Sequence, residues 1–266
     1  RHSSTNEYEQ AMKVLSIWRS LHTIPLNTFQ TTLRRKVSSL NFYSPIIAQR
    51  LKRTPSIILK LQRFNNMNLA RMQDIGGLRI VLSSVGEVYR LRKNLLNESS
   101  RFEHELKQSN DYINEPKTDG YRGLHLIYRY KSATHSNLEG LLVELQIRTK
   151  LQHSWATAVE TLGLIEKSSF KTGEGEAEFK EFFKLSSALF AHNENQPVLK
   201  EYEGYSISKI AKDLKSLEEK LNIFQKLQGV VTSSEYIGTN NKVIGNCEYF
   251  LVELNLKDEQ PQVNIK

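Results

Sequence analysis

The chain has 266 residues, of which 39% are hydrophobic, and a formal net charge of +8. This length and apolar content suffice for one sizeable core with an appendage or for two small domains, so we expect a folded protein. No window approaches the roughly 18 uninterrupted apolar residues of a membrane span, and the first residues lack the apolar stretch of a signal peptide. A soluble, cytoplasmic protein with no membrane partner is therefore expected.

The excess of basic residues favours polyanionic partners such as nucleotides, phosphate groups or RNA, because each phosphate that Lys or Arg neutralises releases counterions. Many basic proteins bind nothing acidic, so charge alone leaves the partner open. The sequence holds a single cysteine, Cys247. This excludes an internal disulfide and, with no histidine cluster near it, a zinc site. Its expected place is a half-buried position on a strand.

Apolar spacing and capping residues predict the elements of the first part of the chain. Thr54 can cap a helix whose first turn accommodates Pro55, and Ser84 can cap another helix. A β-branched stretch between them predicts a strand. The expected elements are helices over 8–21, from 54 onward and over 85–96, and a strand over 75–82.

Short strands and a return to helical spacing follow. Strands are expected over 101–107, 123–131 and 141–148, and the last two form an antiparallel hairpin across a polar loop. The sequence after them predicts a helix over 151–166 and a short Phe-rich helix over 179–190.

The character of the chain changes beyond a polar stretch around Gly204. From Ile207 to Phe224 apolar residues alternate three and four apart, the pattern of a helical seam that needs a partner surface. Residues 248–255 and 262–265 look like two strands of a small sheet. The fold class expected is α+β: a mixed, mainly antiparallel sheet flanked by helices, then a C-terminal helical linker and a small, partial β appendage.

One expected strand presents polar groups in a row. Glu144, Gln146 and Arg148 alternate with apolar residues, so the three polar side chains share one face of the strand. A carboxylate, an amide and a guanidinium in one row suit a binding or catalytic site. A solvated strand face gives the same pattern, so the row alone leaves both interpretations open.

A second carboxylate, Asp74, stands just before the strand over 75–82. Two carboxylates on neighbouring strands can share Mg²⁺, which prefers oxygen ligands and usually keeps waters and substrate phosphates. Cations that hold a triphosphate, with carboxylates that hold its metal, are what phosphoryl-type transfer requires. A structural cap would also explain Asp74, and a solvated helix face would also explain the nearby basic residues. These basic residues are Arg50, Lys52, Arg53, Lys60 and Arg71.

A glycine-containing loop precedes the strand that carries His125. The loop holds Lys117 and Tyr121, and such a ring can stack on a nucleobase while the ammonium meets a phosphate. The loop therefore suits a nucleotide acceptor, and a turn whose tyrosine covers the core is the alternative.

Four segments, in order along the chain, resemble the motifs of the RelA/SpoT alarmone synthetases. RLKRTPSIILK resembles their ATP-side motif, and RMQDIGGLR resembles their magnesium-aspartate motif. DYINEPKTDGYRGLH resembles their acceptor-binding loop, and VELQIRT resembles their catalytic-glutamate motif. Any one segment would be weak support. Together the four segments span about 50–166, and four motifs in the same order do not arise by chance.

The resemblance implies roles on the ATP side of the site. Asp74 and Glu144 would hold Mg²⁺, and Glu144 would also help to deprotonate the attacking hydroxyl. Arg50 and Arg79 would sandwich the adenine of ATP. The phosphates would be contacted by Lys52 and Lys60, assisted by Ser56.

The resemblance also implies an acceptor pocket. Tyr121 would stack on the acceptor base, and His153 and Glu160 on the following helix would support the site. The family's hydrolase half, with its metal-binding His-Asp signature, has no counterpart in the sequence, so we expect a synthetase without its own alarmone hydrolase. The remaining implied acceptor-binding residues are Lys117, His125, Gln146 and Arg148.

Flanking segments narrow the resemblance to a subgroup that includes CapRel-type fused toxin–antitoxins. The stretches that carry this narrower resemblance are WRSLHTIPLNTF, AQRLKRTPSI and LQHSWATAVET. In that subgroup the synthetase is toxic and a C-terminal region inhibits it. The implied domains are a nucleotidyltransferase-like synthetase (toxin) domain over 1–195, a helical connector over 196–230, and the start of a pseudo-zinc-finger-like regulatory region, short or truncated, over 231–266.

Three functions remain open at this point. The subgroup implies transfer of pyrophosphate from ATP to the 3′ CCA end of tRNA, which stops translation, with a phage protein as activator and no DNA partner. An ordinary (p)ppGpp or ppApp synthetase, acting on GDP, GTP or adenosine nucleotides, is the alternative. A catalytically dead binding module is the third, and the intact Asp74, Glu144 and Tyr121 argue against it. The flanks and the positive charge favour tRNA. In either active case a ribose hydroxyl attacks the β-phosphate of ATP and AMP leaves.

Overall fold

The chain divides into two compact units, each described by itself from a computed structural model. The sheet unit comprises Arg1–Asn110 and Leu124–Ile147, and the helical unit comprises Asp111–Gly123 and Arg148–Lys266. The structure describes residues 2–97, 102–165, 177–236 and 242–254.

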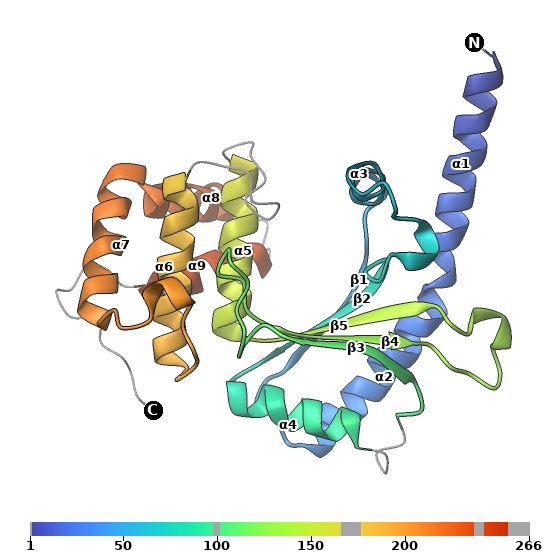
Figure 1. The fold of residues 1–266 in the computed structure, drawn as a ribbon, viewed down its shortest axis with the longest axis horizontal. Coiled ribbons are helices and arrows are strands. Elements are labelled where there is room, and N and C mark those ends of the chain that lie inside the picture. Colours follow the sequence, from blue (N-terminus) through green and yellow to red (C-terminus); the bar gives the residue numbers. More distant parts are fainter. Residues whose placement is uncertain (1, 98–101, 166–176, 237–241, 255–266) are drawn as a thin grey trace. The chain divides into compact units, whose positions relative to one another are not determined.

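The sheet unit is built from four α-helices and five strands in the order α1-α2-β1-α3-β2-α4-β3-β4-β5 within its described residues (Figure 1). Its helices are α1 (His2–Leu21), α2 (Thr23–Ser39), α3 (Thr54–Arg63) and α4 (Val85–Leu96). Its strands are β1 (Ile46–Leu51), β2 (Gly76–Leu82), β3 (Glu105–Asp111), β4 (Leu124–Arg129) and β5 (Leu142–Thr149), the ends of β3 and β5 running on into the helical unit.

The strands form one sheet in the order β1-β2-β5-β4-β3. β1 pairs antiparallel with β2, and β4 pairs antiparallel with β5. The central strands are largely buried: β2 reads GGLRIVL and β5 reads LVELQIRT, and one face of the two strands is apolar while the other carries Arg79, Glu144 and Gln146. This sheet with flanking helices confirms the predicted α+β class.

Helices cover the sheet through apolar stripes. Leu26, Phe29, Leu33 and Val37 recur at helical spacing on α2 and are buried, and this stripe packs against β1 and β2. Figure 1 shows α2 and α4 along the same face of the sheet, with α3 on the other side. α1 adds Leu15 to a small core cluster with residues of α3 and of the segment before β2.

The helical unit is a helix assembly with its own core. It contains α5 (Lys150–Ile165), α6 (Ala177–Asn193), α7 (Ile207–Leu221), α8 (Ile223–Tyr236) and α9 (Lys242–Leu254). α9 packs on α5 and α8, and α6 packs on α5 and α7. Of the helices in the described ranges, none is both long and apolar enough to cross a membrane.

Most predicted elements are present. The helix over 85–96 is α4, and the Ser84 hydroxyl accepts a hydrogen bond from the Glu87 amide at 3.2 Å as its cap. The helix after Lys52 begins at Thr54 with Pro55 in its first turn, but the capping role predicted for Thr54 is wrong, because Arg53 occupies the cap position. The predicted hairpin is β4 and β5.

Two strands of the sheet unit differ from the sequence prediction. β1 was not predicted, because most of its residues are exposed and it lacks the clear alternation of a half-buried strand. Arg50 consequently lies on a strand rather than before a helix. The strand expected over 101–107 is β3, Glu105–Asp111, an exposed strand at the sheet edge whose polar residues give no strand signal.

The predicted C-terminal strand over 248–255 is wrong, because α9 covers this segment as far as Leu254. Cys247, Phe250 and Leu254 are buried at helical spacing, so Cys247 is a core residue of a helix rather than a half-buried strand residue. The expected small β appendage is therefore helical as far as the structure describes it, and 262–265 lies outside the described residues. The seam from Ile207 to Phe224 is also interrupted: Asn222 adopts a left-handed conformation and separates α7 from α8.

Candidate functional site

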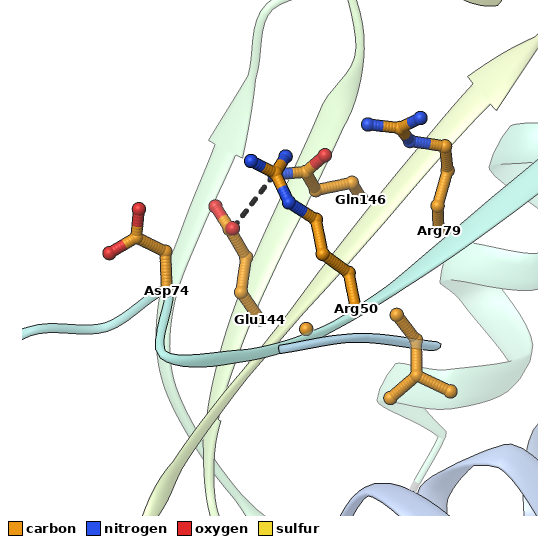
Figure 2. Close-up of a pocket in the computed structure, with 7 residues that line it drawn as sticks. Arg50, Asp74, Arg79, Glu144 and Gln146 are labelled. Carbon is orange, nitrogen blue, oxygen red and sulfur yellow. Dashed lines mark hydrogen bonds between the residues drawn. The ribbon is translucent and has the colours of Figure 1, made fainter. Parts of the chain in front are cut away.

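A polar pocket lies over β1, β2 and β5 of the sheet unit (Figure 2). Figure 2 shows the carboxylates of Asp74 and Glu144 next to each other, with Arg50 and Arg79 on the side of Glu144 away from Asp74. We call this pocket the sheet pocket, and its lining residues are Arg50, Asp74, Gly77, Leu78, Arg79, Glu144 and Gln146.

Strand register explains why these side chains meet. Arg50 of β1 lies opposite Gly77 of β2, and Arg79 is two residues beyond Gly77, so both guanidinium groups project from the same face of the sheet. A Cβ on Gly77 would lie 3.3 Å from the backbone oxygen of Glu144. The glycine therefore allows β2 and β5 to approach closely where the carboxylate is needed.

Asp74 is held by two lysines just before β2. Its Oδ2 accepts a hydrogen bond from Lys52 Nζ at 2.9 Å, and its Oδ1 accepts one from Lys60 Nζ at 2.8 Å. Burial raises the pKa of Asp74, but the hydrogen bonds and charges of Lys52 and Lys60 outweigh it, so the pKa lies below the ordinary value. Asp74 is therefore ionised at neutral pH. Its two cationic partners are Lys52, which follows β1, and Lys60 on α3.

Glu144 on β5 is held by two neighbours. Its Oε1 lies 2.9 Å from His125 Nδ1, and its Oε2 accepts a hydrogen bond from Gln146 Nε2 at 2.8 Å. Burial and the charge of Asp74 raise the pKa of Glu144, while His125 and Gln146 lower it by more. With only 9% of Glu144 exposed, a solvated strand face does not explain the polar row on β5.

The pocket fits a hard divalent cation. Asp74 and Glu144 present oxygen ligands from two elements. The negative charge of Asp74 raises the pKa of Glu144, and a shared cation would offset this repulsion. The described residues contain no group of three or more metal-ligating His, Cys, Asp or Glu side chains. Two carboxylates plus substrate phosphates are the usual Mg²⁺ arrangement, so the residues present fit magnesium carried with a nucleotide.

The loop 111–123 of the helical unit gathers the predicted acceptor residues Lys117 and Tyr121. Lys117 Nζ lies 5.0 Å from the centre of the Tyr121 ring, and the Arg148 guanidinium lies 4.8 Å from the same ring. Arg148 also donates a hydrogen bond to the Tyr121 hydroxyl at 2.5 Å. An aromatic ring flanked by two cations is suited to a base attached to phosphates.

The remaining predicted residues are placed as follows. His125 of β4 lies opposite Gln146 of β5, which brings both beside Glu144. Ser56 lies in the first turn of α3 and does not line the sheet pocket. His153 and Glu160 lie on α5, where His153 Nε2 is 3.2 Å from the Asn246 side chain of α9.

Sequence reasoning missed one support of the lysine pair. Arg19 on α1 donates a hydrogen bond from its Nε to the Lys52 backbone oxygen at 2.9 Å. The Lys52 amide donates to the Ile75 oxygen at 2.8 Å, so the backbone that carries Lys52 is fixed from both sides. No local pattern could reveal this contact, since Arg19 reads as an ordinary charged residue on an amphipathic helix.

Comparison with known proteins agrees with this geometry. Residues 49–173 match a family model described as "Region found in RelA / SpoT proteins". The match covers just under half of the chain, and we call residues 49–173 the RelA/SpoT region. That region contains every residue of the sheet pocket, as well as Lys117, Tyr121 and Arg148.

Relatives of this region are named as pyrophosphokinases. GTP pyrophosphokinase YjbM of Bacillus subtilis is 36% identical over 124 residues, which is 45% of this chain and 57% of that protein. GTP pyrophosphokinase YwaC of the same organism is 29% identical over 140 residues, 50% of this chain and 65% of that protein. The chain thus spans less than two thirds of the length of either relative.

Solved structures share the fold. The small alarmone synthetase 1 of Bacillus subtilis, bound to its product pppGpp, has a TM-score of 0.54 at 26% identity, covering 70% of this chain and 94% of that one. The small alarmone synthetase 2 of Bacillus subtilis has a TM-score of 0.54 at 25% identity, covering 65% and 90%.

Proposed function

We propose that this chain is an ATP-dependent pyrophosphokinase that transfers the pyrophosphate of ATP to the 3′ hydroxyl of GDP or GTP, as in (p)ppGpp synthesis. The observation that carries the proposal is the pairing of Asp74 and Glu144 in one pocket with Arg50 and Arg79. The likeness of the fold to a synthetase bound to pppGpp supports the guanosine acceptor.

In this proposal the sheet pocket binds ATP. Arg50 and Arg79 hold the adenine between them, and the ammonium groups of Lys52 and Lys60 turn from Asp74 toward the phosphates, with Ser56 assisting. Asp74 and Glu144 would hold Mg²⁺, which when bound neutralises the charge that develops on the transferred phosphates. Tyr121 stacks on the acceptor base beside Lys117 and Arg148 in the helical unit. The resemblance also implies acceptor contacts for His125 and Gln146 of the sheet unit.

The chemical step is an in-line displacement. The acceptor's 3′ oxygen forms a bond to the β-phosphorus of ATP, the bond between that phosphorus and the α–β bridging oxygen breaks, and AMP leaves with the electron pair. The hydroxyl proton passes to the carboxylate of Glu144. The lowered pKa of Glu144 keeps its carboxylate ionised, and His125 and Gln146 hold it in position.

The second candidate acceptor is the 3′ CCA end of tRNA, as in the CapRel-type subgroup with its phage-protein activator. The observation in its favour is the net charge of +8, which suits a long polyanion. Under this candidate the residues 1–195 form a toxic synthetase domain, 196–230 a connector and 231–266 part of a regulatory region. We prefer GDP or GTP as the acceptor because the relatives with matching sequence are named as GTP pyrophosphokinases.

Transfer of a labelled phosphate separates the candidates. The protein is incubated with Mg²⁺ and ATP labelled on the γ-phosphate, and GDP, GTP, ADP and deacylated tRNA are offered separately. Label on GDP or GTP supports the proposal, and label on tRNA alone replaces it with the second candidate. Absence of label on every acceptor, when a known synthetase labels GDP in the same buffer, would overturn both.

A further inference from the structure

The loop 111–123 is tied to helix α6 by a hydroxyl that makes two bonds. Ser187 Oγ donates to the Gly120 backbone oxygen at 2.6 Å and accepts from Arg122 Nε at 3.0 Å. Ser187 is 1% exposed and Arg122 is 3% exposed, so water cannot readily replace either bond. The residue enclosed by these two attachments is Tyr121.

Close packing at Gly120 reinforces the attachment. Gly120 has a φ of +90°, and a Cβ at this position would lie 3.1 Å from Ser187 Cβ and 3.2 Å from Trp155 Cζ2. The loop backbone is therefore pressed against side chains of α5 and α6 at the residue before Tyr121. Only glycine combines this conformation with this approach.

Arg122 is the inner anchor of the loop. Its Nη1 donates to the Ile113 oxygen at 3.1 Å, which closes the loop on itself, and its Nη2 has no hydrogen-bond partner among the residues that the structure describes. Burial lowers the pKa of Arg122 to about 10, and the charge of Glu194 opposes that shift. Glu194 is itself fixed by a hydrogen bond from Gln152 Nε2 at 2.8 Å.

The residue that holds Arg122 from outside the loop by a hydrogen bond lies beyond the RelA/SpoT region. That region ends at residue 173, and Ser187 is on α6. We propose that Ser187 is a positioning residue for acceptor binding, acting through Gly120 and Arg122 to fix Tyr121 in the orientation that receives the acceptor base. The inference rests on the proposed function for its substrate, but the attachment itself can be measured without any substrate.

The first test measures the attachment alone. Hydrogen–deuterium exchange is followed in peptides covering 111–123 for the wild type, Ser187→Ala and the control Ser154→Ala. Ser154 is also fully buried, but its hydroxyl donates to Leu151 of its own helix at 2.8 Å. We expect faster exchange across the loop in Ser187→Ala only. Equal exchange in the two variants would overturn the inference, whichever acceptor the protein uses.

The second test asks whether the attachment positions the acceptor. Ser187→Ala should raise the KM for the acceptor about tenfold, the effect of losing about 1.4 kcal/mol of hydrogen bonding, and leave the KM for ATP unchanged. Ser154→Ala should change neither constant. An equal rise in both KM values would show a general loss of structure and overturn the positioning role. If the wild type labels no acceptor, the proposed function fails, while the exchange experiment still decides whether α6 holds the loop.

Discussion

The sheet pocket and the loop 111–123 are held in place by different kinds of contact. In the pocket, Glu144 is fixed by Gln146, two positions away, and by His125 on the neighbouring strand, and Asp74 by lysines 14 and 22 positions away. In the loop, Ser187 reaches Gly120 and Arg122 across 67 and 65 positions. A site built from neighbouring strands carries its supports within its motifs, whereas a site on a loop depends on whichever distant element the loop packs against.

The largest effect should follow a change at the carboxylates of the sheet pocket. Glu144→Gln keeps the size of the side chain and removes the proton acceptor and metal ligand, so we expect the rate of labelled-phosphate transfer to fall about 10³-fold or more. The transfer rate of the Asp74→Asn variant should fall by a similar factor. Initial rates at saturating ATP and acceptor measure this.

The matched control is Glu105→Gln on β3. Glu105 is an exposed carboxylate, and its contact with Lys131 Nζ is long, at 3.9 Å, so its neutralisation should leave the rate within about twofold. A Glu144→Gln protein with wild-type activity would show that the chemistry does not take place in the sheet pocket.

A smaller loss of activity is expected from the lysine pair. Lys60→Met removes one of the two ammonium groups proposed to bind the phosphates of ATP, so kcat/KM for ATP should fall about 10- to 100-fold, the range of a charged hydrogen bond. The control is Arg63→Met, which removes an exposed positive charge from the last turn of the same helix. Equal losses in the two variants would mean that α3 contributes only general positive charge.

The difference between the two regions also explains what the sequence could predict. Asp74, Glu144, Arg50 and Arg79 were identified from spacing and motif resemblance, and strand register then brings all four into the sheet pocket. Their relation is local, since it depends on the alternation of strands and on the order of the motifs. The residue types at these positions also carry the chemistry, so a pattern search finds them.

Residues that act through packing escaped prediction. Ser187 lies among small and apolar residues on α6, and nothing in that run indicates a contact with a loop 65 residues earlier. The segment that forms α9 was misread as a strand for a related reason. Its apolar run YFLV fits both periods over so short a length, and only packing against α5 and α8 selects the helix.

Packing at the loop gives the next prediction, which concerns stability. Gly120→Ala places a methyl group against Ser187 and Trp155 in a left-handed conformation. The conformation costs about 1 kcal/mol and the overpacking about 1–3 kcal/mol more, so the free energy of unfolding should fall by about 2–4 kcal/mol. Urea unfolding measures this change.

The control for this substitution is Gly204→Ala in the same unit. Gly204 has a φ of +85°, and a Cβ there would have nothing within 4 Å. Gly204→Ala should therefore lower the free energy of unfolding only by the cost of the backbone conformation, about 1 kcal/mol. If both substitutions cost the same, the loop is not pressed against α6, and the difference between the two regions drawn above would not hold.

The smallest effect expected is a change in how stability depends on pH, caused by Glu194. Burial raises the pKa of Glu194, while hydrogen bonds from Thr149 and Gln152 and the charge of Arg122 lower it by less. The folded protein therefore keeps the Glu194 proton to a higher pH than the unfolded chain does. Between the ordinary carboxyl value of about 4.3 and the raised value, the contribution of Glu194 to the free energy of unfolding should fall as pH rises.

Comparison with Glu194→Gln isolates this contribution, because the other titrating groups are common to both proteins. Burial, together with Glu253 and the charge of Glu194, raises the pKa of Tyr249 on α9 to about 12, so Tyr249 stays neutral throughout the window. The unfolding free energy of the wild type minus that of the variant should decrease from pH 4 to pH 7. An increase would mean that the Glu194 pKa is lowered on folding, so that the attraction of Arg122 outweighs burial. The sign of this pH dependence thus shows whether burial or the attraction of Arg122 has the larger effect on the pKa of Glu194.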